Sequence, residues 1–466
     1  MKETNIDVGV NSPFDLQQFN KTKASDFQKQ LKDIYKAKNK LTFLEINNSI
    51  DYDIISINSK RNYEEHSEDK LIYEVVKKPK IEDNKICDFY EINTGIFVGC
   101  LILGNQKLVI NSGYNTSFFR LLLRQANNLY VDSNANYDQS SENYDVLNVL
   151  EYLFLSTLKN AINFGAPKKY IQKNEKGWNI RGRIDISKYL STDFYKKDGI
   201  SYSYRELSFD SDILNILIYA IGLCNKEYVN KNFKEIVSFM DEIKGDIHIL
   251  KPTEIMLSRC TKSPVLSNGL YSKYRKPLVY AEMIIKHNNL TPDSKNGKKA
   301  SGWIVDISEL WEEYIYNLLV KNFSDWRISA QENIELYKGA FYERSNFPDI
   351  IMEKNGHIVI LDAKYKKMDF ISKDVDRSDL QQVQSYYGYY SALGKHIIDA
   401  VLLVYPAREE PAGNKRTSTS MFGIPGCSTF FDISYIKIGS NNVEQQKNEE
   451  NFIKRIREMI ENCNCQ

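Results

Sequence analysis

The feature that most constrains this 466-residue chain is an Asn355-Gly356 dipeptide between two apolar runs, 347–352 and 357–361. An Asn-Gly pair in this setting predicts a two-residue β-hairpin loop, because both turn residues tolerate positive φ. Such a loop makes Lys354 pair with His357, and each further pair lies one residue farther from the turn. The two predicted strands therefore have a defined register.

In this register Asp349 lies directly opposite Asp362. Directly paired residues point to the same face of a sheet, with Cβ atoms about 4.5–5.5 Å apart. The strand period of two places Lys364 on that face as well. The sequence therefore predicts that two carboxylates and one ammonium group converge.

Two carboxylates this close repel each other unless a cation lies between them or one takes up a proton. Their oxygens, the backbone carbonyl of Ala363 and waters would form the hard-oxygen site that Mg²⁺ prefers. The metal would activate a water and polarise a phosphoryl oxygen, while Lys364 would orient or deprotonate the nucleophile. This pattern indicates phosphodiester hydrolysis. In the structural alternative, Asp349 begins a strand after a proline and Asp362 and its neighbours end one at the surface.

The segment resembles the signature of the PD-(D/E)XK nucleases, and within them the McrC family, the nuclease subunits of McrBC-type modification-dependent restriction systems. The stretches that carry this resemblance are the helix 305–314, the strand Leu361-Asp362-Ala363-Lys364-Tyr365-Lys366 and the Asp-x-x-Gln helix 379–386. Weaker similarities lie at Gly182-Arg183-Ile184-Asp185, at Asp212-Ile213-Leu214-Asn215 and over 99–123. The similarity spans residues 92–440.

The resemblance implies a set of metal ligands and catalytic residues: Asp349, Asp362, the backbone carbonyl of Ala363, Lys364, Gln382 and Glu312. The two aspartates and the carbonyl would bind Mg²⁺, the lysine would serve the attacking water, and the glutamine would support the site. Glu312 would add a further carboxylate in or near the metal site. Its alternative is a solvated helix position beside Glu313.

Two other features have structural alternatives that we prefer. Tyrosines 386, 387, 389 and 390 could stack on DNA, but at helical spacing beside a sheet most would be core residues. Gly182-Arg183 could belong to the family's Gly-Arg-hydrophobic-Asp element, but we prefer a turn between packed elements.

Missing motifs exclude several classes of protein. The longest apolar runs, such as 96–103 and 400–405, are far shorter than the roughly 20 residues of a membrane helix. The first residues lack the apolar stretch of a secretory signal, so we expect a cytoplasmic protein with free thiols and no membrane contact. Cysteine and histidine spacings do not fit a zinc site. Without a Gly-x-x-x-x-Gly-Lys-Ser/Thr loop, any nucleotide-driven motor must come from a partner.

Charge is distributed unevenly behind a net value of +1: residues 91–300 carry +7 and residues 301–466 carry −5. The basic side chains that fall close together in the middle are Arg259, Lys262, Lys273, Arg275 and Lys276. Such a cluster could meet phosphates. A solvated lysine-rich surface explains it equally well.

We expect an α+β chain with four parts. Residues 1–90 form a polar N-terminal extension with short strands at 41–46 and 70–76, and residues 91–135 a small β module and helix that is a candidate for contacting a partner. Residues 136–300 form a mostly helical, basic middle. Residues 301–466 form a PD-(D/E)XK-like α/β nuclease domain with a mixed central sheet, which begins with an amphipathic helix over 305–323.

Three functions remain open. The leading hypothesis is a Mg²⁺-dependent endonuclease subunit that acts on double-stranded, possibly modified DNA. It would depend on an McrB-like AAA+ GTPase, which alone would use GTP, because an acidic nuclease part would hold DNA poorly by itself. The second is a self-sufficient PD-(D/E)XK restriction endonuclease whose residues 1–90 recognise DNA. The third is a non-catalytic adaptor that stimulates a partner NTPase, with a purely structural acidic pair.

Overall fold

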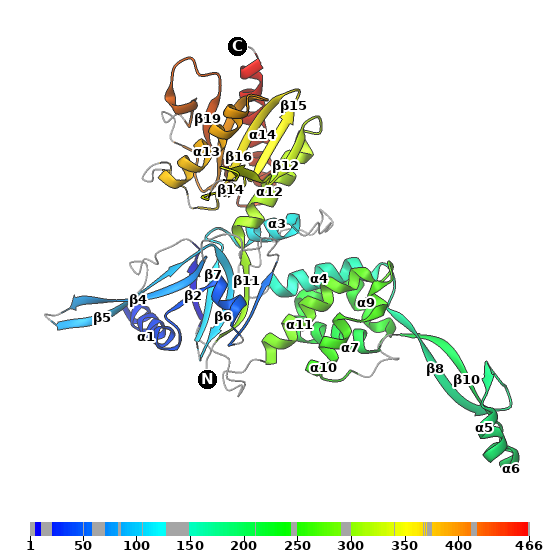
Figure 1. Ribbon diagram of the computed structural model, residues 1–466. Coiled ribbons are helices and arrows are strands. Elements are labelled where there is room, and N and C mark those ends of the chain that lie inside the picture. The colour runs from blue at the N-terminus through cyan, green and yellow to red at the C-terminus, as the bar shows by residue number, and fades with distance from the viewer. Residues whose placement is uncertain are drawn as a thin grey trace. The chain divides into compact units, whose positions relative to one another are not determined.

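The structure is a computed structural model that describes residues 5–10, 21–49, 51–57, 70–82, 85–104, 106–126, 149–209, 211–243, 249–289, 300–339, 341–366, 368, 370, 375–411 and 417–464. The chain divides into two compact units, Met1–Leu147 with Pro292–Gln466, and Asn148–Thr291. The second unit is thus an insertion into the sequence of the first (Figure 1). None of the described helices is long and apolar enough to cross a membrane.

The N-terminal part of the first unit is built on two sheets. In the described residues the larger sheet has the strand order β1-β7-β6-β11-β3 and the smaller one β2-β4-β5. The strands are β1 (Asn5–Gly9), β2 (Lys40–Thr42), β3 (Tyr52–Ile57), β4 (Leu71–Glu82), β5 (Lys85–Thr94), β6 (Phe97–Leu103), β7 (Gln106–Asn111) and β11 (Ala300–Asp306). The helices are α1 (Lys21–Ala37), α2 (Phe43–Asn48) and α3 (Thr116–Ala126).

The expected strand over 41–46 is wrong beyond Thr42, where α2 begins instead. The Phe43 amide donates to the Lys70 carbonyl at 2.9 Å, and the Phe43 ring stacks on Phe97 at 5.3 Å. These contacts to distant residues end the strand, although the local apolar pattern favours its continuation.

Residue 301 does not begin a separate unit, because β11 belongs to the N-terminal sheet. It pairs antiparallel with β6 and parallel with β3. At Gly302, with φ +144°, a Cβ atom would lie 2.1 Å from the Cys100 carbonyl oxygen, so only glycine allows this approach. The following helix therefore begins at Ile307, where the Asp306 carboxylate caps it by accepting from the Ser308 amide at 2.9 Å.

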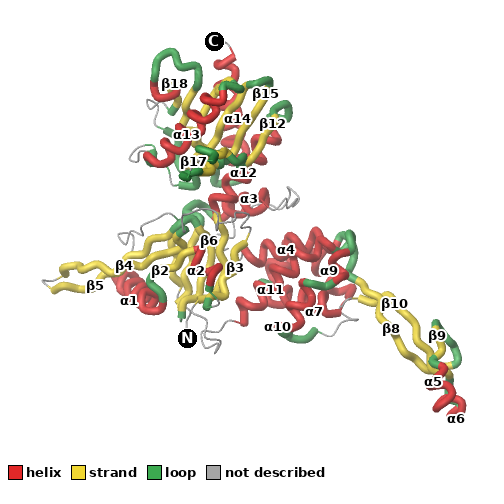
Figure 2. Tube along the Cα trace, viewed as in Figure 1, coloured by secondary structure: helices red, strands yellow, loops and turns green. Residues whose placement is uncertain are grey.

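The second unit is helical, as expected, but also carries a long hairpin that the sequence did not predict (Figure 2). Its helices are α4 (Val149–Ile162), α5 (Ile186–Lys188), η3 (Tyr189–Asp193), α6 (Phe194–Lys196), α7 (Ser211–Leu223), α8 (Lys226–Asn232), α9 (Lys234–Ile243), α10 (Glu254–Thr261), η4 (Pro264–Ser267), η5 (Ser272–Tyr274) and α11 (Arg275–Asn289). Its strands are β8 (Lys168–Gly177), β9 (Arg183–Ile184) and β10 (Ile200–Phe209). β8 has no buried residue, so it lacks the alternation of apolar and polar residues that marks a half-buried strand.

The C-terminal part of the first unit contains a mixed sheet in the order β12-β15-β16-β17-β19-β18 among the described residues. Its strands are β12 (Arg327–Ala330), β15 (Ile350–Lys354), β16 (His357–Ala363), β17 (Ile397–Ala407), β18 (Ser418–Ser420) and β19 (Phe430–Lys437). β16, β17 and β19 run parallel, and the other pairs are antiparallel. A separate small hairpin consists of β13 (Ile334–Leu336) and β14 (Arg344–Asn346), and the helices are α12 (Ile307–Asn322), α13 (Arg377–Leu393), η6 (Met421–Gly423) and α14 (Asn442–Asn464).

Helices cover both faces of this sheet (Figure 1). On one face, Val383 and Tyr386 of α13 pack into a buried cluster with Ile358 and Ile360 of β16. On the other face, α12 is fixed by the fully buried Trp311, whose indole N–H donates to the Val404 carbonyl of β17 at 3.1 Å. Because strand side chains alternate, Asp362 shares the face of Ile358 and Ile360, beneath α13.

Candidate active site

The register predicted from Asn355-Gly356 is confirmed. Both turn residues have positive φ, 53° and 82°, and the pairs run from Lys354 with His357 to Ile350 with Leu361. Asp349 immediately precedes β15, and Asp362 lies in β16 one position beyond the last pair. The local turn chemistry therefore brings the two acids to the same end of the hairpin.

Both acids are buried, Asp349 with 8% and Asp362 with 0% of its surface exposed. The Asp349 carboxylate reaches across the hairpin, where its Oδ2 accepts a hydrogen bond from the Ala363 amide at 2.8 Å. This contradicts the structural alternative in which the second acid ends a strand at the surface. Two carboxylates out of water and side by side are costly unless a cation or a proton accompanies them.

Asp362 has an incomplete set of partners among the described residues. Lys364 Nζ forms an ion pair with Oδ2 at 2.7 Å, and Oδ1 has no hydrogen-bond donor. Burial, followed by the negative charge of Asp349, raises the pKa of Asp362 to about 7.

Lys364 is mostly buried, with 19% of its side chain exposed. Burial favours its neutral form, but the charges of Asp362 and Asp349 outweigh this and raise the pKa of Lys364 above its ordinary value. The side chain is therefore an ammonium group. In this state it can donate hydrogen bonds and offset negative charge, but it cannot accept a proton.

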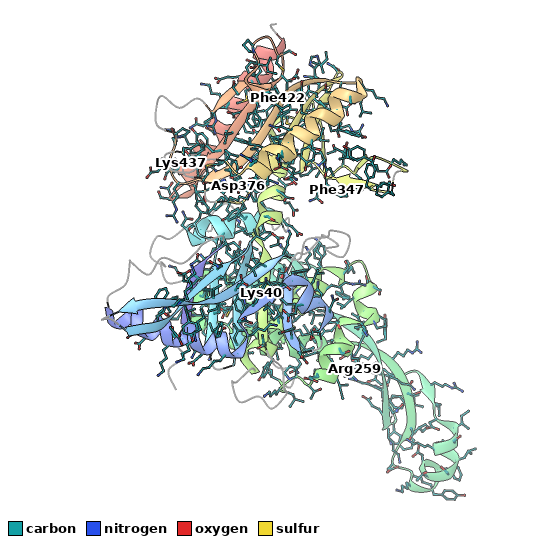
Figure 3. The ribbon with its side chains drawn as sticks, turned by 60° about the vertical axis from the view of Figure 1, so that its left-hand side comes forward. Lys40, Arg259, Phe347, Asp376, Phe422 and Lys437 are labelled. Atoms are coloured by element: carbon teal, nitrogen blue, oxygen red, sulfur yellow. The ribbon has the colours of Figure 1, made fainter. Side chains whose placement is uncertain are left out.

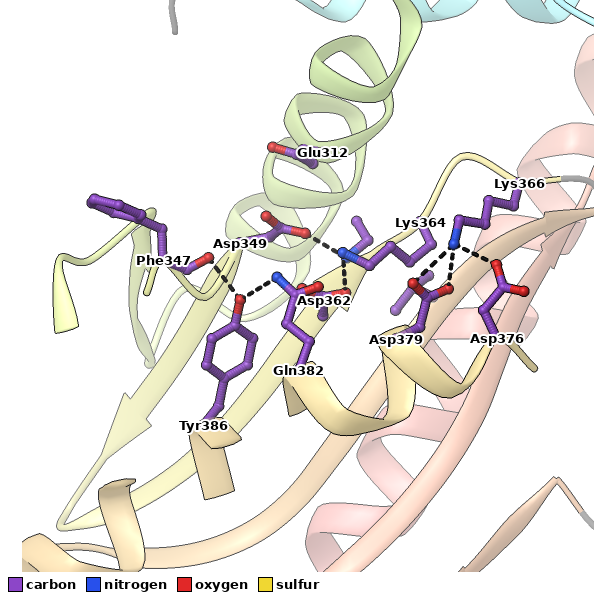
Figure 4. Close-up of polar contacts among 12 residues, drawn as sticks. Glu312, Phe347, Asp349, Asp362, Lys364, Lys366, Asp376, Asp379, Gln382 and Tyr386 are labelled. Atoms are coloured by element: carbon purple, nitrogen blue, oxygen red, sulfur yellow. Dashed lines mark hydrogen bonds and ion pairs between the residues drawn. The ribbon is translucent and has the colours of Figure 1, made fainter. Parts of the chain in front are cut away.

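Gln382 lies on α13 beside the acids (Figure 4). Its Nε2 donates to the Tyr386 hydroxyl at 2.6 Å, and that hydroxyl donates to the Phe347 carbonyl at 3.0 Å. Burial and then the charges of Asp362 and Asp349 raise the pKa of Tyr386 well above its ordinary value, so it stays neutral. The two residues hold the segment that leads into Asp349.

Glu312 projects from α12 on the side of Asp349 (Figure 4). Its Oε2 accepts a hydrogen bond from the side-chain Nε2 of Gln331 at 3.1 Å. The backbone N–H of Gln331 donates to the backbone carbonyl of Asp349 at 3.1 Å. Gln331 thus links Glu312 to the backbone at Asp349. The sequence did not indicate this residue, because it lies in an irregular segment with φ 51°.

A second cluster lies beside the first. Lys366 Nζ contacts both Asp379 oxygens at 2.9 Å and Asp376 Oδ2 at 2.6 Å, and the Tyr405 hydroxyl donates to Asp379 Oδ2 at 3.0 Å. Burial favours neutral Lys366, but its bonds to the two aspartates raise its pKa. The Asp379 carboxylate is thus fully occupied by protein donors.

The site fits a hard cation through its donor set. Asp362 presents a buried oxygen without a donor, next to a second carboxylate. Among the described residues no three His, Cys, Asp or Glu side chains gather as metal ligands. A cation held by Asp349 and Asp362 would therefore complete its coordination with the Ala363 carbonyl, water or substrate oxygens, as Mg²⁺ commonly does.

The other features have structural roles. Tyr386 and Tyr390 are buried in the core, and Tyr387 and Tyr389 pack against it. Gly182 lies in a turn with φ 75°, while Asp185 caps α5 by accepting from the Lys188 amide at 3.1 Å.

The basic cluster of the second unit is partly engaged by protein groups. Arg259 forms an ion pair with Asp212 at 2.5 Å, Arg275 donates to the Leu266 carbonyl at 3.1 Å, and Lys273 lies over the Phe164 ring at 4.3 Å. These contacts reduce its capacity to meet phosphates.

A cavity of about 540 Å³ lies at the other end of β16, lined by Trp326, Lys354, His357 and Asp399 among others. None of the predicted site residues lines it. Because the predicted chemistry rests on the two aspartates, the site is assigned by its side chains and not by this hollow.

Comparison with known proteins places the chain in a family. The family model described as "McrBC 5-methylcytosine restriction system component" matches residues 65–406. The chain belongs to this family. The membership expected from the sequence is confirmed, and the matched region of the McrBC component includes both aspartates and Gln382.

A solved structure has a similar fold. A chain of the refined half-complex from the tetradecameric assembly of Thermococcus gammatolerans McrB AAA+ hexamers with bound McrC is 17% identical, with a TM-score of 0.56. That match covers 97% of this chain and 100% of the other. A chain of the cryo-EM structure of the Thermococcus gammatolerans McrBC complex is 18% identical, covering 70% and 89%, but its TM-score of 0.37 supports no argument. The search of curated proteins found no match.

Proposed function

We propose that this chain is the DNA-cleaving subunit of an McrBC-type restriction system, a Mg²⁺-dependent endonuclease of the PD-(D/E)XK type. The observation that carries the proposal is the buried pair Asp349 and Asp362 with Lys364 2.7 Å from the second acid. Membership of the McrBC family supports a role in restriction.

The residues divide the work of phosphodiester hydrolysis. Asp349, Asp362 and the Ala363 carbonyl would hold Mg²⁺, which when bound lowers the pKa of water and offsets phosphoryl charge. The Lys364 ammonium group lies beside the Asp362 carboxylate, where it orients the attacking water and stabilises the charge that develops on the phosphate. Gln382 and Tyr386 keep the strand entry at Phe347 fixed, and Gln331 ties Asp349 to Glu312.

A partner supplies the nucleotide-driven step in this proposal. The similar chain belongs to an assembly of McrB AAA+ hexamers with bound McrC, and this sequence has no phosphate loop of its own. We therefore propose that an McrB-like AAA+ GTPase recruits this chain to double-stranded, modified DNA. Restriction of foreign DNA would take place in the cytoplasm.

The test is cleavage of plasmid DNA with and without 5-methylcytosine, in Mg²⁺, with and without the AAA+ partner and GTP. We expect wild type to cut only when the AAA+ partner and GTP are both present, and Asp362→Ala to be inactive. The control Asp376→Asn, at an exposed acid beside the site, should cut like wild type. Cutting without the partner would favour the self-sufficient nuclease. Equal behaviour of wild type and Asp362→Ala would favour the adaptor and refute the catalytic assignment.

A further inference from the structure

The hairpin of β13 and β14 ends in three exposed aromatic side chains, which we call the aromatic tip: Tyr337, Phe341 and Tyr342. Their exposed fractions are 64%, 99% and 47%. The hairpin precedes Phe347, labelled at the edge of the C-terminal sheet in Figure 3. No step of the proposed hydrolysis uses these rings. Clustered apolar groups left in water commonly mark a binding surface.

The three rings lie close to one another. Tyr342 contacts Phe341 edge-on with ring centres 4.8 Å apart, and contacts Tyr337 at 5.3 Å. The turn is fixed by positive φ at Tyr337 and Gly339, and the Gly339 amide donates to Glu343 Oε2 at 3.2 Å. The three rings are therefore grouped at the turn of the hairpin.

The base of the hairpin is bonded to the candidate active site on both sides. Before β13, Gln331 contacts Asp349 and Glu312. At the end of β14, Asn346 Nδ2 donates to Ser385 Oγ of α13 at 3.1 Å, and the carbonyl of the next residue, Phe347, accepts from the Tyr386 hydroxyl. The position of the aromatic tip is thus set by the residues that position the acids.

Reach and charge identify the occupant. Phe341 lies eight residues from Asp349, so it is at most about 26 Å away along an extended strand, less than one turn of duplex DNA, about 34 Å. Among the described side chains near the tip, Lys338 pairs with Glu335, and Glu343 accepts from the Gly339 amide. Exposed aromatic rings suit base stacking better than contact with the phosphate backbone.

We infer that Phe341 inserts into the base stack of the DNA duplex whose cleavage we assign to the Asp349 and Asp362 site. Tyr342 and Tyr337 would pack beside the inserted ring. This inference rests on the proposed function. Partial unstacking would kink the duplex and fix the scissile phosphate relative to the two acids. The hairpin would then act as a positioning element for the substrate.

The test uses the full chain with Asp362→Asn to stop cleavage, together with the AAA+ partner, GTP and Mg²⁺. The probe is a methylated duplex that contains 2-aminopurine, whose fluorescence rises when it is unstacked. We expect the fluorescence to rise when the Asp362→Asn parent binds the probe. Adding Phe341→Ala should abolish this rise and weaken DNA binding about 5- to 150-fold. Phe341→Trp in its place should restore both the rise and the binding. Phe422→Ala, at a phenylalanine 55% exposed in the same unit, is the matched control and should match the parent.

Several outcomes would overturn the inference. These are no fluorescence rise with the parent, parent-like behaviour of Phe341→Ala, or loss of binding to the AAA+ partner in place of DNA. A changed melting temperature is not expected, because the ring is 99% exposed. Cleavage is scored separately without Asp362→Asn: if wild type cuts DNA and Phe341→Ala equals it, only this inference fails, whereas a wild type that never cuts refutes the proposed function.

Discussion

Two lysine–aspartate clusters lie side by side at the end of β16, and they differ in how completely the protein satisfies them. Asp362 and Asp379 are both buried, with 0% and 4% exposed. Asp379 accepts from Lys366 and Tyr405 with both oxygens occupied, whereas Asp362 Oδ1 has no donor among the described residues. A satisfied buried carboxylate stabilises the fold, and an unsatisfied one beside a second carboxylate is suited to bind a cation.

Replacing each aspartate with asparagine should separate the clusters most strongly. Asp362→Asn should lower partner-activated DNA cleavage at least about 10³-fold, because it removes a charge that would bind the proposed metal, while the chain stays folded. Asp379→Asn should keep cleavage within about tenfold but lower the free energy of unfolding by about 2 kcal/mol, since a charged hydrogen-bond acceptor is lost. Plasmid cleavage and thermal unfolding measure these effects. An inactive, fully stable Asp379→Asn would assign the second cluster to the chemistry.

The two lysines offer the same contrast at a smaller scale. Lys364→Met should lower cleavage about 10²-fold, because an ammonium group that would face the scissile phosphate is lost. It should also lower the free energy of unfolding, since the buried Asp362 loses its neighbouring cation. Lys366→Met should leave cleavage nearly intact and lower the free energy of unfolding by about 1–2 kcal/mol. The 40% exposure of the Lys366 side chain limits this effect. Single-turnover cleavage and urea unfolding would measure both. Equal activity losses in the two variants would remove the distinction between the clusters.

Proton binding at Asp362 should link stability to pH. Burial and the charge of Asp349 raise its pKa from 3.8 to about 7, so between these values the folded chain keeps a proton that the unfolded chain has lost. Stability from this group therefore falls as the pH rises through that window and is constant above it. The melting temperature of Asp362→Asn minus that of wild type should therefore increase from pH 5 to pH 8.

Magnesium should compensate at the high-pH end. Because Mg²⁺ would bind the deprotonated carboxylate of Asp362, its stabilising effect on wild type should be small at pH 5.5 and larger at pH 8, and absent in Asp362→Asn. Thermal unfolding with and without Mg²⁺ gives this result independently of cleavage. A Mg²⁺ effect that does not depend on pH would place the metal elsewhere.

Much of the candidate site could be predicted because its main signal is local. A two-residue loop and the strand period of two fix which residues oppose each other, so Asp349, Asp362 and Lys364 follow from Asn355-Gly356. Helix α2 was missed because Lys70 and Phe97, which are distant in sequence, fix its start. The β8–β10 hairpin was missed because strands without a buried face show no apolar pattern.

The sequence by itself determined the hairpin, its register and the family, since these depend on neighbouring residues and on matched motifs. The tertiary structure decided which charges remain unsatisfied. Lys364 and Lys366 have the same chemistry and lie two residues apart, so the strand period does not distinguish them. Only the packing of α13 and β17 brings Asp379 and Tyr405 together with Lys366. It likewise decided that β11 joins a sheet formed mostly by residues far earlier in the chain. Burial and partner geometry arise from contacts between distant segments, so no local pattern encodes them.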